Sequence, residues 1–304
     1  MAKIIMWEEN MLILISDAFG PDLPEKLKKF GEVTDDKSRL AQADVVLVRS
    51  KTKCTKEYID SAPNLKLIIR GGVGTDNIDK VYAAKKGILV HNTPKASGIA
   101  VAELAFALML AVPNRIIEGH NSMKEGKWIK KELKRTELHG KTLCLVGTGN
   151  IATQFAKRAK AFGMDIKAYR KSGKPHEIAD VKPTLAEALE GADYVSLHLP
   201  LTDDTRDMID ADAISAMKEG VIIINTGRGA TVDAQAMTKA LTDGKVRAYA
   251  TDVWPSDPPP EDYPLLKAPN VIMTPHLGAS SKENLGRIGE EVIDIIDKFL
   301  KGGK

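Results

Sequence analysis

Short apolar runs and longer segments with helical spacing alternate along the whole chain. The runs are four or five residues long, and each is followed by a segment that can form a helix or a loop. This alternation is typical of α/β proteins, in which helices cover both faces of doubly wound parallel sheets. The strands expected in a first group are Leu12–Ser16, Val45–Arg49, Leu67–Arg70 and Ile88–His91, and those in a second group are Leu143–Val146, Ile166–Tyr169, Tyr194–Leu197, Val221–Asn225, Ala248–Asp252 and Val271–Thr274.

The two groups of strands predict two domains, a number consistent with a chain of 304 residues. The last helical segment, Lys282–Leu300, follows the final strand of the second group and can cross back to the first. We therefore expect a discontinuous domain of residues 1–92 and 279–304 around a central domain of residues 93–278. The pattern leaves open whether the first ten residues form a strand or a loose extension.

One stretch, Ser97–Val112, is apolar on nearly every side and is followed by Pro113. It contains Glu103 and is shorter than the ~20 residues that a bilayer requires. We therefore expect a helix buried in a domain core or a dimer interface. The apolar run at the N-terminus is too short for a signal peptide, which favours a cytoplasmic protein.

Composition favours a soluble enzyme and excludes several other classes. The net charge of +3 is too small to indicate a nucleic-acid partner, and 43% hydrophobic residues are enough for two cores. The two cysteines, Cys54 and Cys144, lie far apart, and no Cys and His residues have metal-ligand spacing. We expect reduced thiols and no bound metal.

A glycine-rich turn follows the strand at Leu143–Val146 and opens a helix expected at Asn150–Phe162. Gly147 permits the tight turn, Gly149 lets the backbone approach a phosphate without a Cβ in the way, and Ala152 packs on the strand. The helix N-terminus offers unpaired N–H groups and the positive end of the helix dipole. The whole unit predicts a site for the pyrophosphate of a dinucleotide.

The end of the next strand, Asp165–Tyr169, indicates which dinucleotide to expect. A carboxylate usually binds the adenosine ribose of NAD there, but this chain has Arg170 and Lys171. A guanidinium pairs with a 2′-phosphate, whereas a carboxylate repels it. We therefore predict a preference for NADP(H), with NAD(H) as the alternative if these side chains are only a solvated strand end.

Several motifs follow one another in a fixed order between Leu12 and Leu300. They are Val48–Ser50, Arg70–Asp79, Asn92–Pro94, Val101–Glu103, Gly126–Trp128, Gly147–Ile151, Asn225–Gly229, Asp252–Trp254 and Thr274–Ser280. In this order they resemble those of the D-isomer-specific 2-hydroxyacid dehydrogenase family, and within it those of the phosphoglycerate-oxidising branch. The resemblance implies an NAD(P)-dependent oxidoreductase with a flavodoxin-like substrate domain, a Rossmann cofactor domain, a cleft between them and a homodimeric assembly.

The resemblance also assigns cofactor-binding residues outside the glycine turn itself. Many of them follow strands of the second group, at the edge where open parallel sheets bind ligands. They are Asn150, Ile151, His198, Pro200, Thr205, Thr226, Gly227, Asp252, Gly278 and Ala279.

Hydride transfer to or from the α-carbon of a hydroxy acid requires a proton to move at the hydroxyl oxygen. Histidine suits this task near neutral pH. Of the six histidines, His276 follows an apolar strand and matches the catalytic motif of the family. The resemblance places His198 beside the cofactor, and the other four match no catalytic motif.

The acid that would pair with the catalytic histidine departs from the family pattern, in which a glutamate holds the histidine tautomer. The aligned residue here is Asp257, whose side chain is shorter by one methylene, or roughly 1.5 Å. A closer backbone, a bridging water or the use of Glu261 would each compensate. We favour Asp257 because neighbouring prolines would hold its loop rigidly.

Arg228 lies in a glycine-flanked turn after the strand Val221–Asn225. A guanidinium there can bind the substrate carboxylate and the carbonyl oxygen that becomes negative during reduction, and the motif match gives it this catalytic role. Gly72, Val73 and Gly74 resemble the carboxylate-binding loop of the family, where backbone N–H groups can form an anion nest.

Arg49, Ser50 and Arg70 complete the expected substrate site, since they end strands of the first domain. Lys130 and Lys131 lie in a segment that resembles the phosphoglycerate enzymes, although they can equally be surface charge. Several cations suggest a second anionic group on the substrate, such as a phosphate. Interconversion of 3-phosphoglycerate and 3-phosphohydroxypyruvate is the first candidate reaction, and NADPH-dependent reduction of glyoxylate or hydroxypyruvate is the alternative.

A third hypothesis is a cofactor-sensing scaffold, as in the corepressors that resemble this family. Fold alone does not decide between binding and turnover. The presence of His276, Arg228 and an acid at Asp257 favours turnover.

Overall fold

The structure is a computed structural model that describes residues 11–302, and their contacts form two compact units. One unit contains the described residues up to Ser97 and those from Ala279 onward, and the other is Gly98–Gly278. The conformation of residues 1–10, left open by the sequence, lies outside the described residues.

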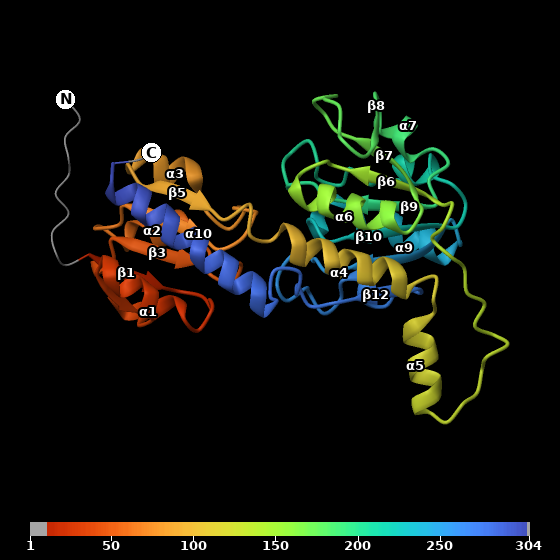
Figure 1. The fold of residues 1–304 in the computed structure, drawn as a ribbon, viewed down its shortest axis with the longest axis horizontal. Helices are drawn as coiled ribbons and strands as arrows, with labels where there is room; N and C mark the ends of the chain where they lie inside the picture. The colour runs from red at the N-terminus through yellow and green to blue at the C-terminus, as the bar shows by residue number, and fades with distance from the viewer. Residues whose placement is uncertain (1–10, 303–304) are drawn as a thin grey trace. The chain divides into compact units, whose positions relative to one another are not determined.

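The first unit is built on a parallel sheet with the strand order β2-β1-β3-β4-β5 (Figure 1). This is the flavodoxin-like order, in which the direction of winding reverses next to β1. The strands are β1 (Leu12–Ile15), β2 (Glu32–Thr34), β3 (Val45–Val48), β4 (Leu67–Arg70) and β5 (Leu89–Asn92), and the helices are α1 (Leu23–Leu27), η1 (Lys28–Phe30), η2 (Lys37–Gln42), α2 (Lys56–Asp60), α3 (Lys80–Lys85) and α10 (Lys282–Leu300).

Alternate residues of the strands in the first unit enter two different apolar clusters. Ile13 joins a cluster with Ile288 of α10, whereas its neighbour Leu14 joins a cluster with Ile59 of α2. Helices therefore cover both faces of the sheet, which explains why β1, β3 and β4 are buried along their whole length. The helix predicted at Lys282–Leu300 is present with the same bounds and packs on this unit.

The second unit contains a parallel sheet with the order β12-β11-β10-β9-β6-β7-β8 (Figure 1). Counted from β6, this is the Rossmann order with an added edge strand. The strands are β6 (Thr142–Val146), β7 (Asp165–Tyr169), β8 (Asp180–Lys182), β9 (Tyr194–Leu197), β10 (Val221–Asn225), β11 (Val246–Thr251) and β12 (Val271–Met273), and the helices are α4 (Gly98–Ala111), α5 (Ile116–Lys124), α6 (Asn150–Ala161), α7 (Leu185–Leu189), α8 (Ala211–Ser215), η3 (Gly229–Thr231), α9 (Ala234–Thr242) and η4 (Pro264–Leu266).

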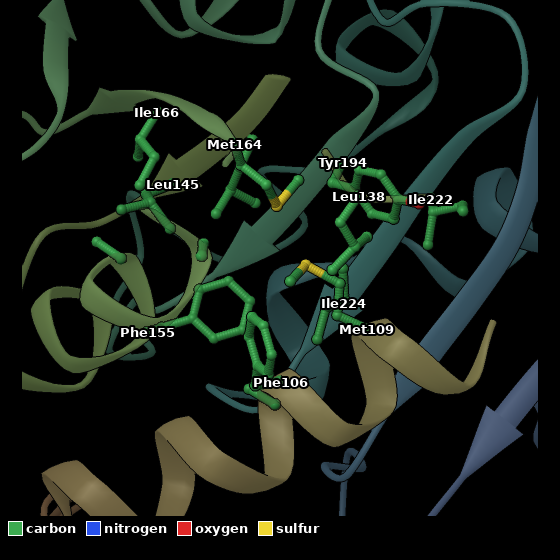
Figure 2. Packing of buried hydrophobic residues seen from close by; sticks show 14 of the residues in the cluster. Phe106, Met109, Leu138, Leu145, Phe155, Met164, Ile166, Tyr194, Ile222 and Ile224 are labelled. Atoms are coloured by element: carbon green, nitrogen blue, oxygen red, sulfur yellow. The ribbon is translucent and has the colours of Figure 1, made fainter. Parts of the chain in front are cut away.

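Helix α4 contributes one side of the main core of the second unit (Figure 2). The ring of Phe106 meets that of Phe155 from α6 edge to face, with ring centroids 6.0 Å apart, and Met109 is fully buried. The core helix predicted at Ser97–Val112 is thus confirmed. No single helix of the described residues is long and apolar enough to cross a membrane, although α4 and α5 pass that test as a pair bent by 67°.

The α/β fold with two parallel sheets is confirmed, but two short strands were not predicted. Both β2 and β8 are three residues long and contain a single apolar residue, Val33 and Val181 respectively. Each lies at the edge of its sheet and pairs with one neighbouring strand, β2 with β1 and β8 with β7. Such short strands carry no hydrophobic period that the sequence could reveal.

Candidate active site

The turn between β6 and α6 has a backbone that only glycine adopts without strain at its first position. Gly147 has a φ of +93°, and a Cβ on it would lie 2.6 Å from the carbonyl oxygen of His198. Its N–H donates to the carbonyl of Tyr169 at 2.9 Å. The turn is therefore set by close approach of three strand ends, those of β6, β7 and β9.

Gly149 occupies the N-cap position of α6 with an extended backbone and a φ of −76°. No side chain donates or accepts a capping hydrogen bond at this helix end. A Cβ added there meets no protein atom within 4 Å, so packing within the chain does not require glycine at this position. Ala152, by contrast, lies on the buried face of α6 and is fully inaccessible to solvent. An uncapped helix N-terminus that faces open space fits the pyrophosphate of a dinucleotide.

Gly149→Ala tests this cradle, because the change adds one methyl group to the open side of the turn. We expect the free energy of unfolding without cofactor to change by less than about 1 kcal/mol, since the φ of this residue suits alanine. We expect NADPH affinity to fall at least about tenfold, because the Cβ enters the space of the phosphates. Thermal unfolding and calorimetric titration measure the two effects, and undiminished affinity would exclude this turn as the phosphate site.

Two buried polar atoms at the carboxyl ends of β9 and β10 have no hydrogen-bond partner among the described residues. They are Nδ1 of His198 and Oγ1 of Thr226. Burial lowers the pKa of His198 to about 4, so its ring is neutral at physiological pH and its Nε2 lies 3.0 Å from Ser196 Oγ. Orphaned polar atoms are rare in folded proteins. Both residues were predicted to bind the cofactor, and such a ligand would supply the missing partners.

The basic residues at the end of β7 lie as the strand prediction placed them. Lys171 pairs with Asp204 of the loop that follows β9, with Nζ 2.5 Å from Oδ2, and both side chains are largely exposed. The sequence does not single out Asp204, because nothing in its local pattern shows that its loop returns to β7. A 2′-phosphate at Arg170 and Lys171 would meet this carboxylate as a competitor for the lysine.

His276 and Asp257 form a direct pair, with Nδ1 of the ring 2.5 Å from Oδ2 of the carboxylate. The structure thus brings Asp257, one of the two acids left open by the sequence, against the ring. His276 also has a φ of +56°. Such a backbone is costly for a residue with a side chain, and it marks sites where the surrounding structure imposes a particular orientation.

Asp252 holds the segment that carries His276. The carboxylate is 1% exposed, and it accepts hydrogen bonds from Thr274 Oγ1 at 2.6 Å, Leu277 N at 2.7 Å and Gly278 N at 2.8 Å. The motif around Asp252 predicts a cofactor-binding role alone. Its contacts in the structure flank His276 on both sides, and they constrain the path of the strained backbone.

The side chain of the buried Asn225 holds the turn that carries Arg228 by two hydrogen bonds to the turn backbone. The amide of Asn225 accepts from Gly227 N at 3.0 Å and donates to the carbonyl of Arg228 at 2.9 Å. A Cβ on Gly229 would lie 2.4 Å from the backbone of Trp254, whose indole N–H donates to the carbonyl of Thr274. The arginine turn, the acid loop and the histidine segment are thereby packed together within the second unit.

In the first unit, the predicted substrate residues lie at the carboxyl ends of neighbouring strands. Arg49 follows β3, and Arg70 ends the neighbouring strand β4, where it pairs in register with Val48. Arg70 is 9% exposed, and its guanidinium leaves room only for a glycine at position 72. The N–H of Gly72 donates to Thr93 Oγ1 at 2.7 Å. Of the proposed anion nest, only the N–H groups of Val73 and Gly74 are left for a ligand.

Lys130 and Lys131 lie in the second unit, on the segment that follows α5. This segment and α5 project from the body of that unit (Figure 1). Both lysines are exposed. The structure does not bring them together with His276 or Arg228.

Known proteins are similar in sequence to this chain over most of its length. Residues 106–278 match the model of the NAD binding domain of D-isomer specific 2-hydroxyacid dehydrogenases. A hydroxypyruvate reductase of Thermotoga maritima is 46% identical over 86% of this chain and 86% of its own length. A D-3-phosphoglycerate dehydrogenase of Methanocaldococcus jannaschii is 43% identical over 95% of this chain. That protein is longer, and the match covers 57% of its length.

A solved structure of similar fold is the D-lactate dehydrogenase of Aquifex aeolicus in complex with NAD and lactic acid. It is 31% identical in sequence and aligns with a TM-score of 0.85. The alignment covers 96% of both chains. The likeness therefore includes both units, each with its own sheet.

Proposed function

This chain belongs to the D-isomer-specific 2-hydroxyacid dehydrogenase family, and from that we propose that it transfers a hydride between NADP(H) and a small 2-oxo or 2-hydroxy acid. The observation that carries the proposal is the His276–Asp257 pair, which lies in the same unit as the glycine turn and the Arg228 turn. An acid–base pair together with a dinucleotide cradle is what this reaction requires.

The roles of the side chains follow from their contacts. The nicotinamide would supply or accept the hydride. The carboxylate of Asp257 accepts from Nδ1–H of His276, which leaves Nε2 as the atom that exchanges a proton with the substrate oxygen. Arg228 would bind the substrate carboxylate and stabilise negative charge on the carbonyl oxygen during reduction. Gly147 and Gly149 would admit the pyrophosphate, with His198 and Thr226 beside it.

The first candidate substrate is the pair 3-phosphoglycerate and 3-phosphohydroxypyruvate. Support comes from the archaeal phosphoglycerate dehydrogenase, which matches 95% of this chain, and from Arg49 and Arg70 at the same sheet edge. Two arginines can bind a carboxylate together with a phosphate. This assignment would place the enzyme in serine biosynthesis.

The second candidate is reduction of hydroxypyruvate or glyoxylate. It is favoured by the match to a hydroxypyruvate reductase along 86% of both chains. It is also favoured by Arg49, whose guanidinium already donates to the carbonyl of Ala279 at 3.0 Å, and by the near-complete burial of Arg70. Both features would leave fewer guanidinium N–H donors accessible to a phosphate.

Initial rates at the absorbance band of the reduced nicotinamide distinguish the two candidates. NADPH and NADH are offered in turn with 3-phosphohydroxypyruvate, hydroxypyruvate and glyoxylate. Rapid turnover of the phosphorylated acid alone supports the first candidate, and rapid turnover of the unphosphorylated acids supports the second. Absence of turnover with all three 2-oxo acids would refute the proposed function. The cofactor-sensing scaffold would then be the remaining hypothesis.

The same rates test the cofactor preference. We expect a lower KM for NADPH than for NADH, because Arg170 and Lys171 can both pair with the 2′-phosphate. Asp204→Asn should lower the KM for NADPH further and leave that for NADH nearly unchanged, since the change frees Lys171 from its ion pair. A wild-type enzyme that prefers NADH would show that the basic strand end is only solvated charge.

We also propose that the protein is a homodimer joined through α5 and the segment that follows it. Three large apolar side chains there are strongly exposed: Trp128 by 76%, Met123 by 58% and Ile116 by 55%. They line a cavity of about 520 Å³ between helix and segment. Exposed apolar groups in such number usually mark an interface. The mass of the protein in solution, measured by light scattering, tests this proposal.

A further inference from the structure

Two residues outside the predicted site hold the loop of residues 49–52, here called the arginine loop, which carries Arg49 and Ser50. The first is Asp17, in the loop that follows β1. Its Oδ2 accepts from Arg49 N at 2.6 Å and from Thr52 N at 3.1 Å. Its Oδ1 accepts from the hydroxyl of Thr52 at 2.7 Å. One carboxylate thus binds both ends of the arginine loop.

The second residue is Asn77, which binds the same two residues from their carbonyl side. Its Nδ2 donates to the carbonyl oxygens of Arg49 and Thr52, at 2.7 Å in each case. The backbone N–H and C=O groups at both ends of the arginine loop therefore have side-chain partners. Without Asp17 and Asn77 these groups would have to find water or a different loop conformation.

The two clamping residues also join three strand ends of one sheet. Asp17 follows β1 and the arginine loop follows β3, its neighbour in the sheet. Asn77 follows β4, in the same connection as the glycine loop Gly72–Gly74. The backbone carbonyl of Asn77 accepts from Cys54 N at 2.8 Å. This hydrogen bond joins the connection after β4 to the segment that precedes α2. The clamp therefore sets the position of the arginine loop relative to the glycine loop.

We propose that Asp17, together with Asn77, is a positioning residue that sets the affinity of the enzyme for its acid substrate by holding Arg49 and Ser50 in place. The inference rests on the proposed function, in which Arg49 and Ser50 contact the substrate. Asp17 acts through the hydrogen bonds of its carboxylate to the loop backbone. All partners of Asp17 and Asn77 belong to the first unit, whereas the predicted cofactor-binding residues other than Ala279 belong to the second, so we expect little effect on cofactor affinity.

Three variants of the full chain test the proposal by the KM of the acid substrate, the KM of NADPH and kcat. Asp17→Ala removes all three hydrogen bonds and is expected to raise the KM of the acid about tenfold or more, with the KM of NADPH within about twofold of wild type. Asp17→Asn is expected to stay within about threefold, because the amide oxygen accepts from the two N–H groups and the amide N–H donates to Thr52 Oγ1.

The matched control is Asp36→Ala, also in the first unit. Asp36 accepts from Ser38 N at 2.9 Å and Ser38 Oγ at 2.7 Å, so its carboxylate binds within its own loop after β2 and not to the arginine loop. It should leave both KM values unchanged. The proposal is overturned if Asp17→Ala behaves like this control, if it raises the KM of NADPH equally, or if Asp17→Asn is as impaired as Asp17→Ala.

A fourth variant, Thr52→Val, and a second measurement, amide hydrogen exchange, cover the remaining outcomes. If Asp17→Ala does not fold, Thr52→Val removes only the hydroxyl contact, and an unchanged KM of the acid in that variant overturns the proposal. Amide hydrogen exchange at Arg49 and Thr52 should be faster in each folded Asp17→Ala or Thr52→Val protein, whether or not any acid is turned over. Absence of turnover in the wild type refutes the proposed function, whereas normal KM values and normal exchange in the variants refute the clamp.

Discussion

Replacement of His276 by alanine is expected to lower kcat by about 10²- to 10⁴-fold, the usual contribution of a positioned acid–base group. The ring nitrogen Nε2 is the atom left to exchange a proton with the substrate, since Nδ1 is bound to Asp257. The affinity for NADPH should change little, because the glycine turn and the β7 strand end lie on other loops. Steady-state rates and calorimetric titration of NADPH measure the two effects.

His91→Asn is a suitable control, because His91 lies on β5 in the first unit and matches no catalytic motif. It should retain wild-type kcat. A His276→Ala enzyme with near-normal kcat would show that another group transfers the proton. Loss of NADPH affinity in that variant would instead show a binding role for the ring.

Asp257→Ala is expected to lower kcat by about 10²-fold or more, whereas Glu261→Ala should leave it within about twofold. The carboxylate of Asp257 contacts Nδ1 of His276 at 2.5 Å and thereby holds the ring in one tautomer and one orientation. Asp257→Asn should be nearly as impaired as the alanine variant, although it has the same shape. Its amide can donate to Nδ1, which places the ring proton on Nε2 and removes the base.

The comparison of the two acids decides between them. A large loss in Glu261→Ala with a small loss in Asp257→Ala would transfer the pairing role to Glu261 and contradict the observed contact. Equal and large losses would indicate that the whole proline-rich loop depends on both residues. Circular dichroism of each variant verifies that its secondary structure is retained.

The pair His276–Asp257 illustrates what the sequence predicts and what it leaves open. The motif identified His276, and the alignment narrowed its partner to two acids four positions apart. Which of them reaches the ring depends on the path of a loop that is separated from His276 by 19 residues in the chain. The shorter side chain of Asp257 reaches because the backbone brings it close, and local pattern carries no information about that approach.

The residues that hold the loops were not identified for a related reason. Asp17 and Asp204 bear no local pattern that separates them from surface polar residues, and Asn77 lies in the motif Arg70–Asp79 with no role of its own assigned. The partners of all three lie far away in the chain. Asp252 was assigned to the cofactor by its motif, yet its carboxylate binds the segment around His276. Hydrogen bonds between distant loops depend on strand order, which brings their ends to one edge of a sheet.

Local order along the chain was enough for the α/β class, for the central strands and helices, and for the glycine turn, because each rests on periodicity or on spacing within a few residues. The edge strands β2 and β8 are defined by their pairing with β1 and β7, not by a hydrophobic pattern of their own. The contact of Asp257 with His276, the hydrogen bonds of Asp17 and Asn77 to the arginine loop, and the ion pair of Asp204 with Lys171 all join segments remote in sequence. Packing and hydrogen bonding in three dimensions determine such contacts. A local pattern of residues cannot predict them, because it holds no information about which distant segments meet.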